Sequence, residues 1–160
     1  MIRLIRCDDR LIHGQCMISV TKEYNIDRII VVDDFTATNA ILRNVFEKAV
    51  NSRIKATCVT VEQSVNEIEK AKTNDENTLI LMKTPQVFVE LRKRVGSLPD
   101  ELNIGPMSNR KGTKRVALWC NLLPSEIEAV RQLVENGVHV YFRQVMNNKQ
   151  IEWSDVKDKL

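Results

Sequence analysis

The stretch "RIIVVDD" (residues 28–34) decides the fold class of this chain. Arg28 precedes an unbroken run of β-branched apolar residues, and the run ends in Asp33 and Asp34. A strand with one face in water would alternate apolar and polar residues, whereas a strand of a parallel sheet covered on both faces is apolar throughout. We therefore expect a buried parallel strand that ends in carboxylates.

Short apolar strands alternate with helical patterns on either side of this stretch. We expect strands at residues 2–6, 28–34, 54–61, 78–83, 101–105, 115–120 and 138–145. Helical periodicity falls between them, over residues 14–24, 37–50, 84–95 and 125–136 and in a helix that carries Val61, Val65 and Ile68, and a short helix is expected in the tail at 152–160. The alternation predicts an α/β fold over residues 1–160 as one domain. Its open, doubly wound, mainly parallel sheet would have about seven strands and helices on both faces.

Three short motifs predict where helices begin. Thr60 with Gln63, and Ser125 with Glu128, have the spacing of a capping box, in which two side chains bond each other's backbone N–H groups. Thr84 precedes Pro85, a residue favoured in the first turn, and is expected to cap its helix.

The composition excludes several classes of protein. Of the 160 residues, 43% are hydrophobic and 28% charged, which is ordinary for a globular domain. A net charge of +3 with few aromatic residues does not indicate nucleic-acid binding. The chain begins without a signal-peptide pattern and holds no membrane-spanning run, so we expect a cytoplasmic protein. Its four cysteines are expected to be free thiols: Cys7, Cys16, Cys58 and Cys120. No clustered ligands appear, so no zinc site is expected.

The densest stretch for chemistry is "RCDDRLIHGQC" (residues 6–16), directly after the first expected strand. It contains His13, one of two histidines in the chain. In doubly wound sheets, ligands bind beyond the carboxyl ends of strands, near a reversal of strand order. The position of His13 is therefore typical of a functional site.

These residue types suit a phosphoryl group. Imidazole is nucleophilic near neutral pH, and the free N–H groups of the following helix, at Gly14 and Gln15, favour an anion. Arg10 can pair with phosphate oxygens in a bidentate manner. Gly14 would leave room for a donor or acceptor, and Asp8 or Asp9 would orient the imidazole or hold Arg10. From the residues alone, a solvated loop histidine or a helix cap is an equally good interpretation.

A resemblance to a known family distinguishes these interpretations. "RCDDRLIHGQ" closely resembles the active-site signature of enzyme IIB of the mannose/fructose/sorbose family of the bacterial phosphoenolpyruvate-dependent sugar phosphotransferase system, usually Arg-Ile-Asp-Asp-Arg-Leu-Ile-His-Gly-Gln-Val. The chain departs from that form at Cys7 and Cys16. The likeness continues through "RIIVVDD", "MKTP", "LNIGPM" and "ENGVHVYFRQV", although Met146 stands where a proline is common. It covers essentially the whole chain.

The resemblance implies a phosphotransferase that acts as a phosphoryl carrier. His13 would receive phosphate from a phosphohistidine of enzyme IIA and pass it to a sugar entering through the membrane subunits IIC and IID. Arg10 would contact the phosphate, with Asp9 also at the catalytic site, and no cofactor or metal would take part. The protein would lie at the inner face of the membrane through IIC and IID. The sequence of this chain does not indicate which sugar is transported. It is compatible with a homo-oligomer.

Other residues carry weaker signals. Asp33 and Asp34 either border the same crevice or serve as turn and cap residues, and we favour the latter. If the strand order reverses between the first and fourth strands, the Thr84 hydroxyl would lie near the phosphate. A basic loop would dock on an acidic rim of enzyme IIA or simply be solvated: Arg110, Lys111, Lys114 and Arg115. His139, within an apolar strand pattern, is expected to be structural.

Three other functions are alternatives to a phosphoryl carrier. A receiver-like signalling domain needs an aspartate at the end of its third strand, where this chain has "TCVTV". A metal-dependent phosphohydrolase using Asp8 and Asp9 needs further acidic ligands at later strand ends, and no convincing set is present. A regulatory paralogue that accepts phosphate without serving transport is compatible with the sequence.

Overall fold

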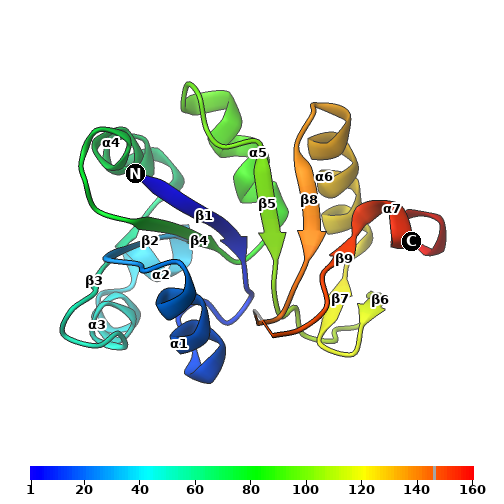
Figure 1. The fold of residues 1–160 in the computed structure, drawn as a ribbon, viewed down its shortest axis with the longest axis horizontal. Coiled ribbons are helices and arrows are strands. Elements are labelled where there is room, and N and C mark those ends of the chain that lie inside the picture. The colour runs from blue at the N-terminus through cyan, green and yellow to red at the C-terminus, as the bar shows by residue number, and fades with distance from the viewer. Residues whose placement is uncertain (146) are drawn as a thin grey trace.

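A computed structural model describes residues 1–145 and 147–160, except for the side chain of Cys16. Its centre is a seven-stranded sheet in the order β3-β2-β4-β1-β5-β8-β9 (Figure 1). Every neighbouring pair from β3 to β8 is parallel, and only β9 runs antiparallel to its neighbour. The strands of this sheet are β1 (Ile2–Cys7), β2 (Arg28–Val32), β3 (Lys55–Val59), β4 (Thr78–Met82), β5 (Glu101–Ile104), β8 (His139–Phe142) and β9 (Ile151–Glu152). The α/β prediction is confirmed.

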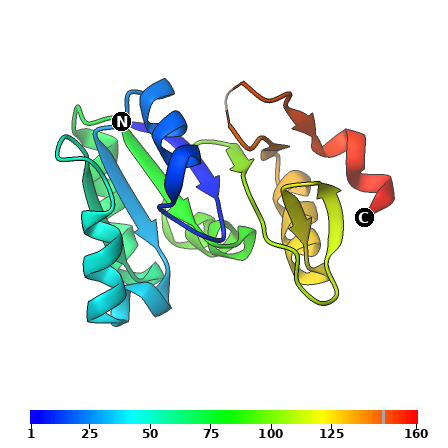
Figure 2. The ribbon, with the colours of Figure 1, turned by 90° about the horizontal axis from the view of Figure 1, so that it is seen from below.

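Helices cover both faces of the sheet, as predicted (Figures 1 and 2). Side chains alternate along β1, so that Ile5 and Cys7 pack in one core cluster and Leu4 packs in the other. The first cluster is covered by α4 (Val61–Thr73), α5 (Pro85–Arg94) and α6 (Pro124–Glu135). The second is covered by α1 (Gly14–Glu23) and, more loosely, by α3 (Ala40–Lys48). The chain ends in α7 (Trp153–Val156) and a 3₁₀ turn (Lys157–Lys159).

The chain's connections diverge between two neighbouring strands of the sheet. The connection after β1 runs through α1 toward β2, whereas the connection after β5 runs through α6 toward β8. A doubly wound sheet opens a crevice at such a point. The strand order thus reverses between β1 and β5. The expected position of Thr84 beside the phosphate depended on a reversal between β1 and β4, and that condition is not met.

The expected strand at residues 115–120 is wrong. A turn at Leu118 and Trp119 divides it into β6 (Lys114–Ala117) and β7 (Cys120–Leu122), which pair as a separate hairpin. The seventh strand of the main sheet is instead β9, which has only two residues and is too short to show a period of its own.

The expected helix at residues 37–50 is two helices, α2 (Asp34–Thr38) and α3. Asp33 caps α2, and the side chain of Asn39 accepts from the backbone N–H groups of Ile41 (3.1 Å) and Leu42 (3.0 Å) to begin α3. Two caps in succession outweigh the apolar periodicity that predicted one helix. Ile41, in the first turn of α3, is exposed.

The capping predictions have mixed outcomes. Thr60 and Gln63 form the expected box, with reciprocal bonds of 3.1 and 3.2 Å. The Ser125 box is wrong, because α6 begins at Pro124 and places Glu126, rather than Glu128, where a carboxylate reaches the backbone N–H of Leu123 (2.7 Å). Thr84 occupies the N-cap position of α5, but its side chain makes no capping hydrogen bond.

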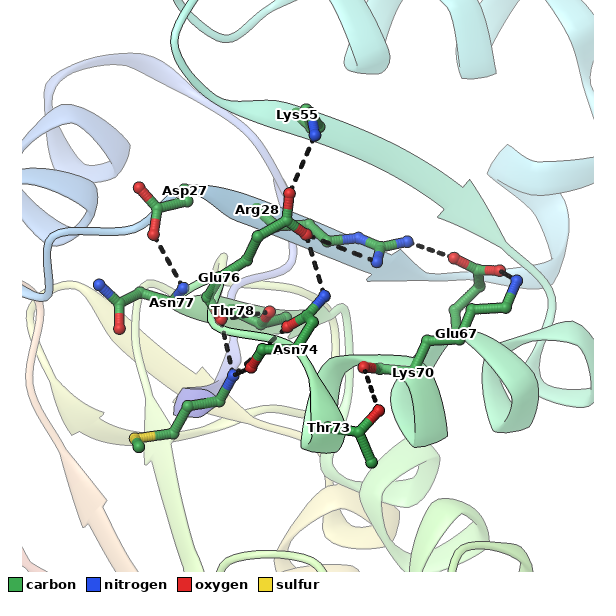
Figure 3. A network of polar contacts seen from close by, with 11 residues as sticks. Asp27, Arg28, Lys55, Glu67, Lys70, Thr73, Asn74, Glu76, Asn77 and Thr78 are labelled. Atoms are coloured by element: carbon green, nitrogen blue, oxygen red, sulfur yellow. Dashed lines mark hydrogen bonds and ion pairs between the residues drawn. The ribbon is translucent and has the colours of Figure 1, made fainter.

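A polar network holds the amino ends of the central strands, at the edge opposite the crevice (Figure 3). The terminal ammonium of Met1 donates to the carbonyl oxygens of Asn74 (2.9 Å) and Glu76 (2.7 Å). Asp27 accepts from the backbone N–H of Asn77 (2.8 Å). These contacts join β1, β2 and β4 at one edge of the sheet and leave the other edge for the site.

Candidate active site

The loop between β1 and α1 carries His13, at the edge toward which the strand arrowheads point (Figure 1). Its backbone is tied to β4, since the N–H of Asp8 donates to the carbonyl oxygen of Met82 (2.9 Å). Leu11 has a φ of 56° and is fully buried, and Ile12 is also buried. Both pack in the α1 core cluster, so the loop is anchored while His13 stays exposed.

His13 occupies the N-cap position of α1, but its side chain makes no capping hydrogen bond. The imidazole therefore does not serve as a cap, one of the two interpretations that the residues left open. The first turn of α1 contains no acidic residue, so its N–H groups, including those of Gly14 and Gln15, face no competing carboxylate there. The arrangement offers a nucleophile and an anion-favouring helix end together.

Gly14 is explained by its backbone rather than by the space around it. Its φ is 52°, in the left-handed region that other residues adopt only with strain. A Cβ added at Gly14 would meet no atom within 4 Å. The chain itself therefore requires glycine here for its backbone conformation, and clearance for a donor or acceptor stays a prediction.

Asp8 and Asp9 have different partners. One oxygen of Asp8 accepts from the backbone N–H of Arg10 (3.2 Å) and lies 3.9 Å from Arg10 Nε. Asp9 accepts from the backbone N–H of Ser108 (2.7 Å), in the segment after β5. Asp8 thus holds Arg10, as one alternative predicted, and Asp9 ties the loop across the crevice to the β5 side.

Two hollows adjoin the loop. His13 lines one of about 500 Å³, whose other walls are mainly apolar residues of α1 and of the segment that follows α3. Arg10 lines another of about 240 Å³, whose walls include Ser108, Asn109 and Trp119. The nucleophile and the cation are both accessible to a second molecule.

The neighbouring strand ends have structural partners. The Asp33 side chain accepts from the Thr36 N–H (2.9 Å) and pairs with Lys83 Nζ (2.9 Å). Asp34 accepts from the backbone N–H of Val61 (2.8 Å). These contacts confirm the preferred interpretation of both aspartates as turn and cap residues. Thr84 is half-buried at the carboxyl end of β4, the other neighbour of β1.

The basic loop is only partly available for docking. Both terminal nitrogens of Arg110 pair with the buried carboxylate of Glu126, at 3.0 and 2.8 Å, and Lys114 Nζ donates to the carbonyl oxygen of Leu160. Lys111 and Arg115 are exposed.

The second histidine and the described cysteines are structural. His139 lies on β8 with Nε2 at 2.8 Å from Glu152 on β9. Cys7, Cys58 and Cys120 are free and buried, and burial raises the pKa of the Cys58 thiol to about 11. Within residues 1–145 and 147–160 there is no metal-binding cluster of histidine, cysteine, aspartate and glutamate. In the same residues no helix has the length and apolar character needed to cross a membrane.

Sequence reasoning missed one member of the loop's surroundings. The sequence places Arg6 in the first strand and indicates no role for it, yet its guanidinium is buried and lies 3.7 Å from Asp8. The available signal was a charged residue between apolar Ile5 and Cys7, two positions before Asp8, because such a residue is buried only when it is paired.

Comparison with known proteins gives one consistent family. Residues 2–159 match the family model described as PTS system sorbose subfamily IIB component. The sorbose-specific EIIB component of Lacticaseibacillus casei is 31% identical over 161 residues, which cover 100% of this chain and 95% of the relative. The mannose-specific EIIAB component of Escherichia coli is 29% identical over 160 residues, and this chain spans only 49% of its length.

Solved structures agree with this match. The IIBSor domain of the sorbose permease from Klebsiella pneumoniae superposes with a TM-score of 0.90 and 30% identity, over 99% of this chain and 97% of that chain. An N-acetylgalactosamine-specific IIB component from Escherichia coli has the same fold, with a TM-score of 0.87 at 24% identity, over 95% of this chain and 99% of that chain.

Proposed function

Because this chain belongs to the sorbose subfamily of IIB components of the phosphotransferase system, we propose that it is a phosphoryl carrier and that His13 carries the phosphate. The observation that supports this most directly is the placement of His13. Its side chain is exposed at the N-terminus of a ten-residue helix, on a loop anchored by buried Leu11 and Ile12. Such anchoring positions the imidazole without a change of the loop during transfer.

In the first step, an unprotonated nitrogen of His13 attacks the phosphorus of a phosphohistidine on enzyme IIA. A new P–N bond forms on His13 as the donor's P–N bond breaks, and the donor imidazole leaves. Arg10 and the N–H groups of Gly14 and Gln15 stabilise the charge on the phosphoryl oxygens. Thr84 lies at the carboxyl end of β4, the other neighbour of β1, and its hydroxyl makes no capping bond. Although the strand order reverses on the β5 side of β1, we include Thr84 as a phosphate-binding candidate on this position.

In the second step, the phosphoryl group passes from His13 to a hydroxyl of a sugar held by the membrane subunits IIC and IID. The P–N bond breaks, a P–O bond forms, and the hydroxyl proton is released. Docking on these subunits would place the protein at the cytoplasmic face of the membrane. Exposed Lys111 and Arg115 are the basic residues proposed to meet an acidic rim on enzyme IIA.

The purified protein, incubated with radiolabelled phosphoenolpyruvate, the general phosphotransfer proteins and a IIA domain, tests the first step. We expect an acid-labile, base-stable phosphate that is lost in His13→Ala. His139→Ala is the matched control, because it removes the chain's other histidine and should keep the label. Label on an aspartate, or label that survives in His13→Ala, would refute the carrier function.

Membranes containing IIC and IID test the second step. Sorbose, mannose and fructose, the sugars named for curated relatives, are supplied in turn to the labelled protein. Transfer of the label to one of them supports a role in transport. Stable label on His13 with every sugar, in membranes that accept phosphate from their own IIB component, would instead indicate the regulatory alternative.

A further inference from the structure

The guanidinium of Arg6 is buried near the end of β1, just before the loop that carries His13, and the proposed transfer does not use it directly. It donates to the side-chain oxygen of Asn103 on β5. It also donates to the carbonyl oxygens of Arg143 (3.0 Å) and Gln144 (2.8 Å), which follow β8. Arg6 therefore joins β1 to the two strands on the far side of the crevice, and its position is fixed by three elements.

Gly105 provides the space for this guanidinium. A Cβ added at Gly105 would overlap the guanidinium group of Arg6. The N–H of Gly105 also donates to the carbonyl oxygen of Cys7 (2.8 Å), which holds the two backbones in this close approach. Glycine at this position is thus explained by the arginine that lies against it.

Asp8 lies between two arginines of very different exposure. Its Oδ2 is 3.7 Å from Arg6 Nη2, and its Oδ1 is 3.9 Å from Arg10 Nε. The side chains of Arg6 and Asp8 are each 2% exposed, whereas that of Arg10 is 40% exposed. One cation is therefore enclosed in the protein with the carboxylate, and the other is exposed to a new anion.

The charges around Asp8 act in opposite directions. Burial raises the pKa of Asp8, while Arg6, the backbone N–H of Arg10 and the charge of Arg10 oppose that rise, and Asp9 adds to it. The neighbouring Cys7 thiol is neutral, because burial raises its pKa well above its ordinary value. If Arg10 leaves, Arg6 is the cation among these groups that still compensates Asp8.

We propose that Arg6 is a positioning residue: it is the permanent counter-ion of Asp8, and it allows Arg10 to move from Asp8 to the phosphate on His13. This inference rests on the proposed function of His13 and Arg10. Without Arg6, the movement of Arg10 would leave a buried carboxylate uncompensated, which is strongly unfavourable. Arg10 would then stay with Asp8, or Asp8 would take up a proton.

Arg6→Met tests the proposal through a pH profile. The variant keeps much of the side-chain volume and removes the charge. At pH 8 we expect phosphoryl transfer to His13 to fall by roughly tenfold to a hundredfold, the range for a displaced catalytic contact. The loss should shrink as the pH falls and Asp8 becomes protonated, so the ratio of variant to wild-type rate rises toward acid. A ratio that does not change between pH 5.5 and 8 would overturn the counter-ion role.

A double variant separates this role from a purely structural one. In Arg6→Met with Asp8→Asn, no carboxylate is left to retain Arg10, so transfer at pH 8 should be several-fold faster than in Arg6→Met alone. A structural role predicts the opposite, because the second substitution removes a further contact. Thr60→Ala, which loses a remote helix cap, is the control for lowered stability and should transfer at the wild-type rate.

If Arg6→Met does not fold, Gly105→Ala displaces the guanidinium without deleting it and should show the same pH dependence.

A second readout does not depend on phosphotransfer: inorganic phosphate is titrated while the Arg10 Nε–H signal is followed by NMR. The half-saturating phosphate concentration should be about tenfold higher at pH 8 in the variant. If the half-saturating phosphate concentration is the same in the variant and the wild type, the role of Arg6 is refuted, whether or not His13 takes label. If His13 takes label at the wild-type rate in all variants, the carrier function stands and the inference about Arg6 is refuted.

Discussion

Replacement of Asp33 gives a quantitative test of how the sheet edge beside the site is held. Asp33 follows β2 and accepts from the N–H (2.9 Å) and hydroxyl (2.6 Å) of Thr36, in the first turn of α2. The same carboxylate pairs with Lys83, which follows β4, at 2.9 Å. Its side chain is 15% exposed and that of Lys83 is 33% exposed, so this ion pair is only partly screened by solvent.

The expected losses follow from these contacts. Loss of an N-cap costs about 1 kcal/mol, and a partly exposed ion pair contributes about 1 kcal/mol. Asp33→Ala removes both and should lower the free energy of unfolding at pH 7 by about 2 kcal/mol. Asp33→Asn keeps an oxygen acceptor for Thr36 and loses only the charge, so about 1 kcal/mol is expected.

The pH dependence has a definite sign. Burial of Asp33 favours its neutral form, but hydrogen bonds from Thr36 and Lys83 outweigh burial and lower its pKa. The advantage of wild type over Asp33→Asn is therefore complete above the unfolded-state pKa of about 3.9 and is lost as the pH falls through the lower folded-state value.

Urea unfolding at pH 7 and at steps down to pH 2.5 measures these differences. Asp75→Asn, the same substitution at an exposed position, is the matched control and should change stability by less than about 0.5 kcal/mol. Equal losses for the Asn and Ala variants at pH 7 would show that the cap contributes nothing. A difference between wild type and Asp33→Asn that persists undiminished at pH 2.5 would refute the assignment of the ion pair.

Three further outcomes are expected. The hydrogen bond to Glu152 raises the pKa of His139, so His139→Gln should lower the free energy of unfolding by less than about 1 kcal/mol at pH 5.5. Urea unfolding should show that this loss vanishes as the pH rises through the folded-state pKa of His139. Gly14→Ala must adopt a left-handed conformation and should lower the free energy of unfolding by about 1–2 kcal/mol; an unchanged urea midpoint would contradict the assigned backbone strain. Thr60→Ala should cost about 1 kcal/mol through loss of its capping box, measured by thermal unfolding against the exposed control Asp75→Asn.

Much of the fold was predictable because its signals are local. The unbroken apolar run at residues 29–32 predicted a strand covered on both faces, and β2 lies at the interior of the sheet with helices on each side. The Thr60 box was predictable for the same reason, since its bonds span three residues. The hairpin of β6 and β7 was missed because a turn at Leu118 and Trp119 carries neither glycine nor proline.

The sequence by itself determined the class of sheet, the family and the segment that bears His13, because periodicity, capping and a continuous motif are properties of neighbouring residues. Only the tertiary structure decided that Asp8 lies between Arg6 and Arg10, and that Arg6 lies against Gly105. Those contacts depend on the register of β1 with β5, in which Cys7 pairs with Ile104. Register is set by the packing of the whole sheet, so no local pattern around residue 6 or residue 105 predicts that they meet.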